Sequence, residues 1–179
     1  MPDATKAASV VPVANLREFF RDALHAALLR QKLAVEDQTE HYVVNLLTLF
    51  ARSEALYDET PEGPRLKPLV VMLTEALEAR SPGDRHRGLQ RLGDVSLFMA
   101  GFFAHGFARR LVDVDYHIAM GGRAYSSLAD SGRPARGTPA RSARDGRSTG
   151  GALGGVFAEL ATKFRELVDA LNEIADAAR

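Results

Sequence analysis

The spacing of apolar side chains predicts an all-α fold for this chain of 179 residues. Apolar residues recur three and four positions apart in successive segments, and no segment shows the strict alternation that is typical of a β-strand. Capping residues precede most of these segments, and stretches rich in Pro, Gly and Ser separate them. We therefore expect a single-domain bundle of about five helices, a linker, and a C-terminal amphipathic helix.

Composition and charge narrow the classes of function. Lys and Arg number 23, as do Asp and Glu, so the net charge is zero and nucleic-acid binding is disfavoured. The absence of cysteine excludes disulfides, thiolate metal sites and cysteine nucleophiles. The longest apolar run, Val95 to Phe107, is shorter than a membrane span of about 20 residues. The N-terminus has no apolar segment typical of a secretory signal, so we expect a cytoplasmic protein without a membrane partner.

The first two helices follow a tail. Residues 1–14 are expected to be flexible, and residues 15–130 to form the bundle. Asn15 and Glu18 form a pattern typical of a capping box, which predicts a helix from Asn15 to about Leu33. Asp37 is expected to open the second helix. Its predicted apolar face consists of Tyr42, Val43, Leu46, Leu47, Phe50 and Leu56.

Two further helices are expected after the break at 61–64. The third runs from about Leu66 to Arg80, and a turn at Ser81 and Pro82 separates it from the fourth, for which Asp84 is a candidate cap. The inward positions of the third helix are predicted to be Leu69, Val70, Leu73 and Leu77. The fourth helix extends to about His105, with Gly106 as its C-cap. A stripe of small residues predicts that another backbone approaches it closely, which makes it the central helix: Gly93, Ser96, Ala100 and Ala104.

Asp113 is expected to cap a fifth helix, Val114 to Leu128. Two consecutive glycines, Gly121 and Gly122, lie inside it, each costing about 1 kcal/mol relative to alanine. Either the helix breaks there or something packs tightly against it. Residues 131–151 contain no aliphatic side chain larger than alanine, which predicts a disordered Arg/Gly/Pro/Ser linker.

The C-terminal segment, 152–179, is predicted to be one regular helix. Its seam of apolar residues has heptad spacing and consists of Leu153, Phe157, Leu160, Phe164, Leu167, Leu171, Ile174 and Ala178. An isolated amphipathic helix is marginal in water, so this seam must be covered. Two partners are open: the chain's own bundle, or a second copy in a coiled coil. The two phenylalanines favour docking on the bundle.

One group of polar residues is a candidate ligand-binding site between the fourth and fifth helices. Asp94 lies within the most apolar helix, so its carboxylate is expected to be at least partly buried and paired with an arginine from residues 109–123. A core ion pair would be structural, whereas an acid–base pair beside arginines would suit an anionic ligand. The candidate residues are Asp94, Arg109, Arg110, Asp115, Tyr116, His117, Arg123 and Tyr125.

No metal, cofactor or catalytic residue is predicted. Helical di-iron proteins use Glu-x-x-His pairs, and this sequence has none. The pair most similar to this motif is Asp22 and His25. The linker carries five arginines and one acid, but without interleaved aromatic residues it is better explained as a spacer than as a nucleic-acid arm.

Four segments carry a resemblance to a known family: Leu92 to Phe103, Val112 to Tyr116, Met120 to Tyr125, and Tyr42 to Phe50. In these segments the chain resembles a family of uncharacterised bacterial all-helical proteins. The resemblance covers most of residues 15–179 and implies a shared helical fold. That family has no assigned activity, so the resemblance implies no catalytic residues.

The sequence leaves two functions open. The first is a non-enzymatic cytoplasmic interaction or regulatory protein, whose partner is a second copy or another protein. The second is a small-ligand-binding protein or enzyme with a pocket around Asp94 and Asp113–His117. A cleft beside Asp94 would favour the second function, and a large exposed apolar stripe would favour the first.

Overall fold

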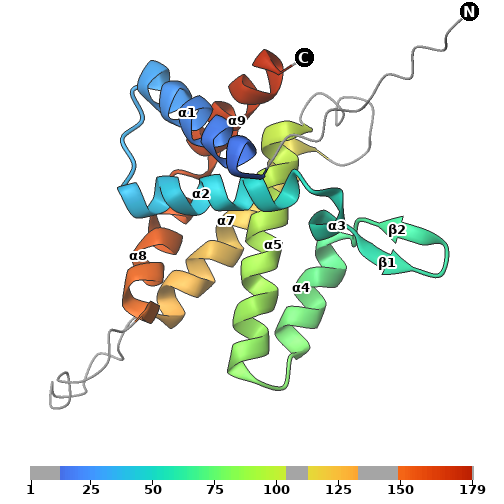
Figure 1. Cartoon of the computed structure of the whole chain (residues 1–179). Helices are drawn as coiled ribbons and strands as arrows, with labels where there is room; N and C mark the ends of the chain where they lie inside the picture. Colours follow the sequence, from blue (N-terminus) through green and yellow to red (C-terminus); the bar gives the residue numbers. More distant parts are fainter. Residues whose placement is uncertain (1–12, 104–112, 133–148, 179) are drawn as a thin grey trace, which may run out of the picture.

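The computed structural model describes residues 13–103, 113–132 and 149–178, and it confirms the all-α class (Figure 1). The predicted tail falls almost wholly outside the described residues, as do Ala104, His105 and Gly106 and most of the predicted linker. The helices are α1 Val13–Gln31, α2 Asp37–Phe50, α3 Ser53–Leu56, α4 Leu69–Glu78, α5 Pro82–Phe102, α7 Val114–Ser131, α8 Thr149–Thr162 and α9 Phe164–Ala177.

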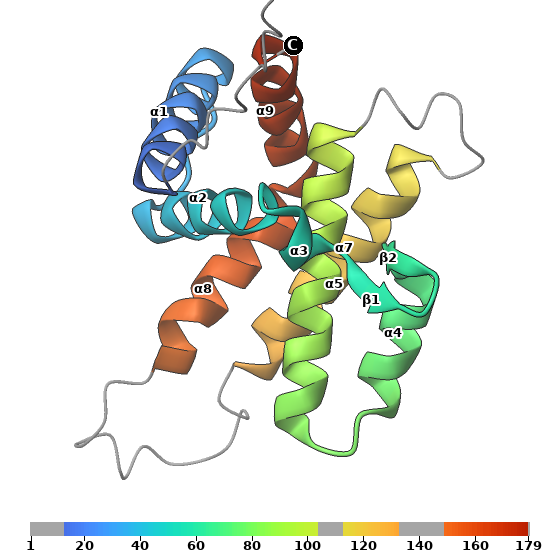
Figure 2. The ribbon, with the colours of Figure 1, turned by 45° about the vertical axis from the view of Figure 1, so that its right-hand side comes forward.

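The predicted central helix is α5, which packs against α2, α4, α7 and α9 (Figures 1 and 2). Small residues on α5 are the reason that these neighbours come close. A Cβ atom built on Gly93 would lie 2.6 Å from the ring of Tyr125, and one on Gly101 would lie 2.5 Å from Cβ of Leu171. Ser96 and Ala100, in the same stripe, are fully buried.

The glycine pair inside α7 is explained by close packing, because the helix continues through it. A Cβ atom on Gly121 would meet the ring of Phe164 and would lie 2.7 Å from Cβ of Ser96. A Cβ atom on Gly122 has nothing within 4 Å. Of the two glycines, only Gly121 is required by its surroundings.

The predicted single C-terminal helix is wrong, because the chain forms two helices that meet at Lys163. In Figures 1 and 2, α8 lies below α2, whereas α9 lies beside α1 and α5. One straight helix cannot follow both directions. At the bend Lys163 departs from helical backbone angles, with φ of −106° and ψ of 22°, and its Nζ donates to the carbonyl oxygen of Ala34.

The seam of these two helices is buried within the chain's own bundle. The ring of Phe157 contacts Tyr42 and Tyr125, and Phe164 fills the space at Gly121. From Phe157 to Ile174, no predicted seam residue is more than 3% exposed. Of the two expected ways to cover the seam, the structure therefore has docking on the chain's own bundle.

A short β-hairpin corrects the expectation that the chain has no strands. Strands β1 Asp58–Thr60 and β2 Gly63–Arg65 are antiparallel. Gly63 has φ of 108°, a left-handed conformation that glycine adopts without strain. Thr60 Oγ1 closes the turn by donating to the carbonyl oxygen of Gly63 at 2.7 Å. Three-residue strands are too short to show an alternating pattern, so the sequence indicated only a break.

Several helix ends differ from the predicted ones, and the reasons are local. Asn15 is no cap, because α1 already begins at Val13. Ser81, not Asp84, caps α5: its Oγ accepts from the Asp84 N–H at 3.0 Å and donates to the Asp84 carboxylate at 2.6 Å. Pro68 delays the start of α4. Asp113 caps α7 as expected.

Replacing the two adjacent glycines of α7 separately should give opposite results. Gly121→Ala should lower the free energy of unfolding by about 1–3 kcal/mol, because the new methyl group collides with Phe164 and Ser96. Gly122→Ala is the matched control and should raise it by up to about 1 kcal/mol through helix propensity. Urea denaturation of both variants measures the difference, and equal effects would contradict the packing described here.

Candidate functional site

Asp94 lies in the middle of α5 and is partly buried, as the sequence predicted. Its Oδ1 accepts two hydrogen bonds, one from the Tyr42 hydroxyl at 2.7 Å and one from the Tyr125 hydroxyl at 2.6 Å. Gln90, one turn earlier on α5, donates from Nε2 to the Tyr42 hydroxyl at 2.9 Å. A single carboxylate oxygen therefore joins α2, α5 and α7. We call Asp94, Tyr42 and Tyr125 the Asp94 cluster.

The expected arginine partner of Asp94 is not found among the described residues. Arg123 is exposed on α7, and Arg109 and Arg110 lie outside the described residues. Arg91, the neighbour of Gln90 on α5, turns to other acceptors: the carbonyl oxygens of Ala55 and Leu56 and the carboxylate of Asp58. The tyrosine hydroxyls supply donors to the buried carboxylate without bringing a second charge into the core.

Burial raises the pKa of Asp94 from 3.8 to about 6. The loss of hydration outweighs the two tyrosine hydrogen bonds and the charge of Arg91, which favour the ionised form. Burial together with the adjacent carboxylate raises the pKa of Tyr42 and of Tyr125, so both hydroxyls stay protonated and act as donors. The titratable proton of the cluster is therefore the one on Asp94.

Aromatic packing covers the Asp94 cluster on the side that faces α8. Phe157 stacks on Tyr125 with ring centroids 5.8 Å apart and meets Tyr42 edge to face, also at 5.8 Å. His86 contacts the same phenylalanine edge to face at 5.8 Å. Asp94 does not line the surface grooves between α1 and α2, between α2 and α8, or beside α4. The cluster can bind and release a proton, but these grooves give a substrate no access to the carboxylate.

The other predicted site residues do not gather around Asp94. Asp115 is exposed and forms an ion pair with Arg165 at 2.6 Å. Tyr116 is 40% exposed. His117 is buried, and burial lowers its pKa. Among the described members of the predicted group, only Tyr125 reaches the carboxylate.

The role of Tyr42 was not predicted from the sequence. This residue was placed on the apolar face of the second helix, where a phenol ring fits as well as a phenylalanine. The hydrogen-bonding requirements of buried polar groups could have indicated this role. A tyrosine hydroxyl on a buried face requires an acceptor, and a buried carboxylate requires donors. Asp94 on the fourth helix and the tyrosines of two neighbouring helices satisfy each other.

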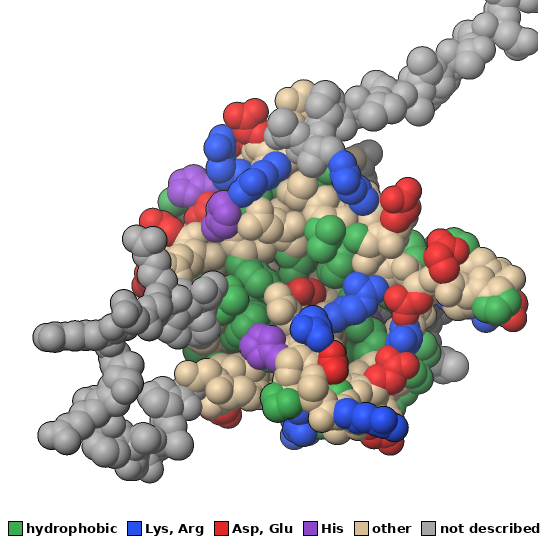
Figure 3. Space-filling model, turned by 60° about the horizontal axis from the view of Figure 1, so that its bottom comes forward, with side chains coloured by type: hydrophobic (Ala, Val, Ile, Leu, Met, Phe, Trp, Pro, Cys, Tyr) green, Lys and Arg blue, Asp and Glu red, His purple; other side chains and the backbone are tan. Residues whose placement is uncertain are grey.

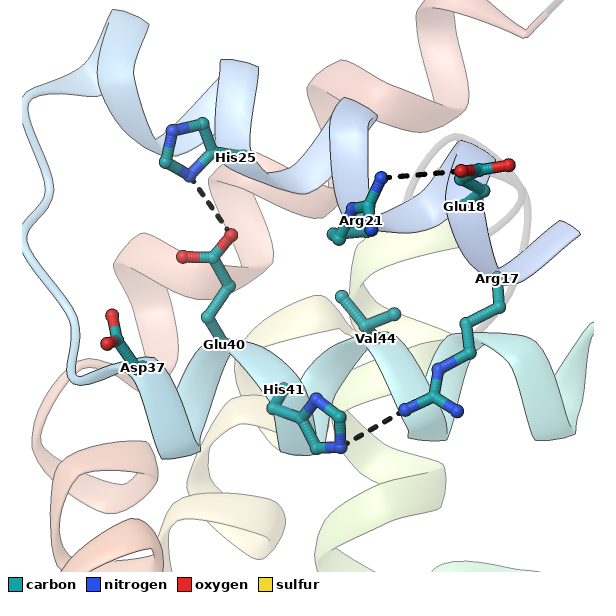
Figure 4. A pocket seen from close by; sticks show the side chains of 8 residues that line it. All are labelled: Arg17, Glu18, Arg21, His25, Asp37, Glu40, His41 and Val44. Carbon is teal, nitrogen blue, oxygen red and sulfur yellow. Dashed lines mark hydrogen bonds and ion pairs between the residues drawn. The ribbon is translucent and has the colours of Figure 1, made fainter. Parts of the chain in front are cut away.

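A polar groove of about 690 Å³ lies between α1 and α2. Figure 4 shows its side chains, and Figure 3 shows purple histidines beside blue and red side chains on that side of the molecule. Arg17 Nη2 lies 3.1 Å from His41 Nε2, and His25 Nδ1 lies 3.1 Å from Glu40 Oε1. Within the described residues, no group of three or more His, Asp or Glu side chains is placed to hold a metal ion.

Two smaller grooves lie elsewhere on the bundle. One, of about 460 Å³, lies between α2 and α8, with Tyr42 and Val156 among its lining residues. The other, of about 340 Å³, lies between the hairpin, α4 and α5, and Lys67 and Arg91 contribute to its walls. Lys67 is paired with Glu75 at 2.9 Å, so this second groove is crossed by an ion pair.

The outer side of α4 is an exposed apolar surface, which corrects two predicted inward positions. Val70 is 56% exposed and Leu77 is 50% exposed, with the half-buried Leu73 between them. The side that packs on α5 consists of Leu69, Met72 and Ala76. Because α4 is apolar around most of its circumference, hydrophobicity alone did not indicate which side faces the core.

Comparisons of the chain with protein-family models, curated proteins and solved structures return no match. The resemblance to a bacterial helical family therefore stays a prediction. Across the described residues, no helix combines the length and apolar character that crossing a membrane requires.

Asp94→Asn should change how stability depends on pH. The folded-state pKa of about 6 exceeds the ordinary 3.8, so protonation of Asp94 favours the folded state. This contribution is fully present below about pH 4 and is lost as the pH rises through 6. Relative to the variant, the wild type should therefore lose about 2–3 kcal/mol of unfolding free energy between pH 4 and pH 7.

Denaturant unfolding of both proteins at each pH measures this difference. Asp130→Asn, at an exposed position on α7, is the control and should give a profile parallel to the wild type. A parallel profile for Asp94→Asn would contradict the buried, titrating carboxyl.

Proposed function

We propose that this chain is a non-enzymatic cytoplasmic interaction protein that associates with a second copy of itself through the outer side of α4. The observation that carries the proposal is the exposure of Val70 and Leu77 on a helix whose other side is fully packed. Helices in soluble bundles normally turn polar residues outward, so an apolar outer side favours a contact with another surface. We call Val70, Leu73 and Leu77 the α4 stripe.

The α4 stripe is suited to pairing with itself. Its spacings of three and four place all three side chains on one side of a helix that is about 15 Å long. A two-fold axis near Leu73 would bring Val70 of the first copy against Leu77 of the second, and Leu77 of the first copy against Val70 of the second. Such self-complementarity is the requirement for a closed, symmetric dimer.

The charges at the two ends of α4 favour an antiparallel arrangement. The last turn carries Glu75 and Glu78, beside helix carbonyl groups that disfavour negative charge. Arg65 precedes the helix and is exposed, as is Glu78. Within the described residues, neither Arg65 nor Glu78 forms an ion pair. An antiparallel neighbour would place its Arg65 and its positive helix end near Glu78.

Two features support interaction over catalysis around Asp94 and Asp113–His117. The Asp94 carboxylate is engaged by two tyrosines beneath Phe157, and the side chain of Asp113 is occupied as a helix cap. A catalytic acid or base must instead come within hydrogen-bonding distance of a substrate.

The expected dimer is weak. Full burial of an aliphatic side chain gives about 1.5–3 kcal/mol, and Val70 and Leu77 are 56% and 50% exposed, so covering each would add about 1 kcal/mol. We therefore expect a weak dimer, with a dissociation constant of about 0.1–1 mM.

Sedimentation equilibrium between about 20 µM and 1 mM tests this association. Leu77→Gln should abolish it, because one amide per copy would be buried without a partner. Leu29→Gln is the matched control: Leu29 is 66% exposed on α1, and its replacement should leave association unchanged. A wild-type protein that is monomeric throughout would overturn the proposal, as would an equal effect of both variants.

Charge reversal tests the antiparallel orientation separately. Arg65→Glu and Glu78→Arg should each weaken the dimer severalfold, and the double variant should restore it, because each reversed charge again faces an opposite one. Restoration depends on an Arg65–Glu78 contact between copies. Failure to restore association in the double variant would contradict this geometry.

A further inference from the structure

The groove between α1 and α2 contains two opposite charges that are not neutralised locally. Arg17 contacts His41 Nε2, and since a guanidinium only donates, that imidazole nitrogen accepts and carries no proton. No carboxylate pairs with Arg17 among the described residues. Asp37, on the neighbouring helix, likewise has no ion pair within the described stretches of the chain. Both side chains line the groove.

The remaining charges of the groove are already engaged. Arg21 lies 3.1 Å from Asp22 and 3.7 Å from Glu18, and Glu40 is paired with His25. Figure 4 shows the arrangement: Asp37 and Glu40 lie toward one end, Arg17 lies toward the other, and Val44 lies between them. The groove therefore offers an anionic end, an apolar middle and a cationic end.

We infer that this groove binds a short zwitterionic peptide, with its terminal ammonium at Asp37 and its terminal carboxylate at Arg17. Asp37 and His41 are one helical turn apart on α2, about 6 Å along the axis, and the Arg17 guanidinium lies beyond, against His41. An extended chain spans at most about 3.6 Å per residue, so a di- or tripeptide covers the axial distance from Asp37 to His41.

The chemistry of each end fits its proposed partner. A guanidinium binds a carboxylate through two parallel hydrogen bonds, and Arg17 uses only one of its five donors in the contact with His41. Val44 provides an apolar surface for a small side chain. The volume of about 690 Å³ is within the range of small-molecule sites. The site lies away from the α4 stripe and does not depend on the proposed dimer (Figure 1).

Binding of trialanine to the full chain, followed by NMR titration, tests the inference. We expect a dissociation constant in the millimolar range or tighter, and a loss of about tenfold when either terminus is blocked, as in N-acetyl-trialanine or trialanine amide. No shift changes in α1 and α2 up to about 10 mM trialanine, the upper end of that range, would overturn the inference.

Two variants assign each end of the peptide. Arg17→Gln should remove the preference for a free carboxylate but keep the preference for a free amine, and Asp37→Asn should do the reverse. Arg21→Gln is the matched control and should change affinity less than twofold, because Arg21 is already paired. Loss of binding in the control, or unchanged preferences in both site variants, would show that the peptide does not bind as inferred. All three positions are exposed, and circular dichroism checks that each variant folds.

Discussion

The buried carboxylate of Asp94 is the group on which the arrangement of the bundle depends. An ionisable side chain within an apolar helix is stable only if donors reach it, and here they come from Tyr42 on α2 and Tyr125 on α7. These two hydrogen bonds fix the rotation of α2 and α7 relative to α5. Phe157 then packs on both phenol rings, which places α8 as well.

Small residues make this arrangement sterically possible. The ring of Tyr125 reaches Asp94 by lying across Gly93, where any side chain would collide with it. Gly121 has the same role in the neighbouring layer, where Phe164 enters between α7 and α5. Hydrogen bonding and close packing are therefore coupled: a side chain at position 93 would displace the ring and leave the carboxylate with one donor fewer.

The sequence predicted the helical class, most of the helices, the small-residue stripe and the partial burial of Asp94, because these follow from local patterns. It did not predict the bend at Lys163, since heptad spacing continues through it and the contact of Lys163 with Ala34 exists only in the folded chain. The tyrosine partners were missed because a helical pattern predicts which side of the helix a residue occupies, but not which residue of another helix it contacts. The exposed side of α4 was missed because both sides are apolar.

Direct observation of the Asp94 carboxyl is the most decisive measurement. In a ¹³C NMR titration of the carboxyl carbon, the pKa of Asp94 should be about 6 in the wild type. It should be higher in Tyr125→Phe, because that variant lacks one donor that favours the ionised form. A pKa near the ordinary aspartate value of 3.8, or one unchanged by the loss of the Tyr125 hydroxyl, would contradict the central role of this carboxylate.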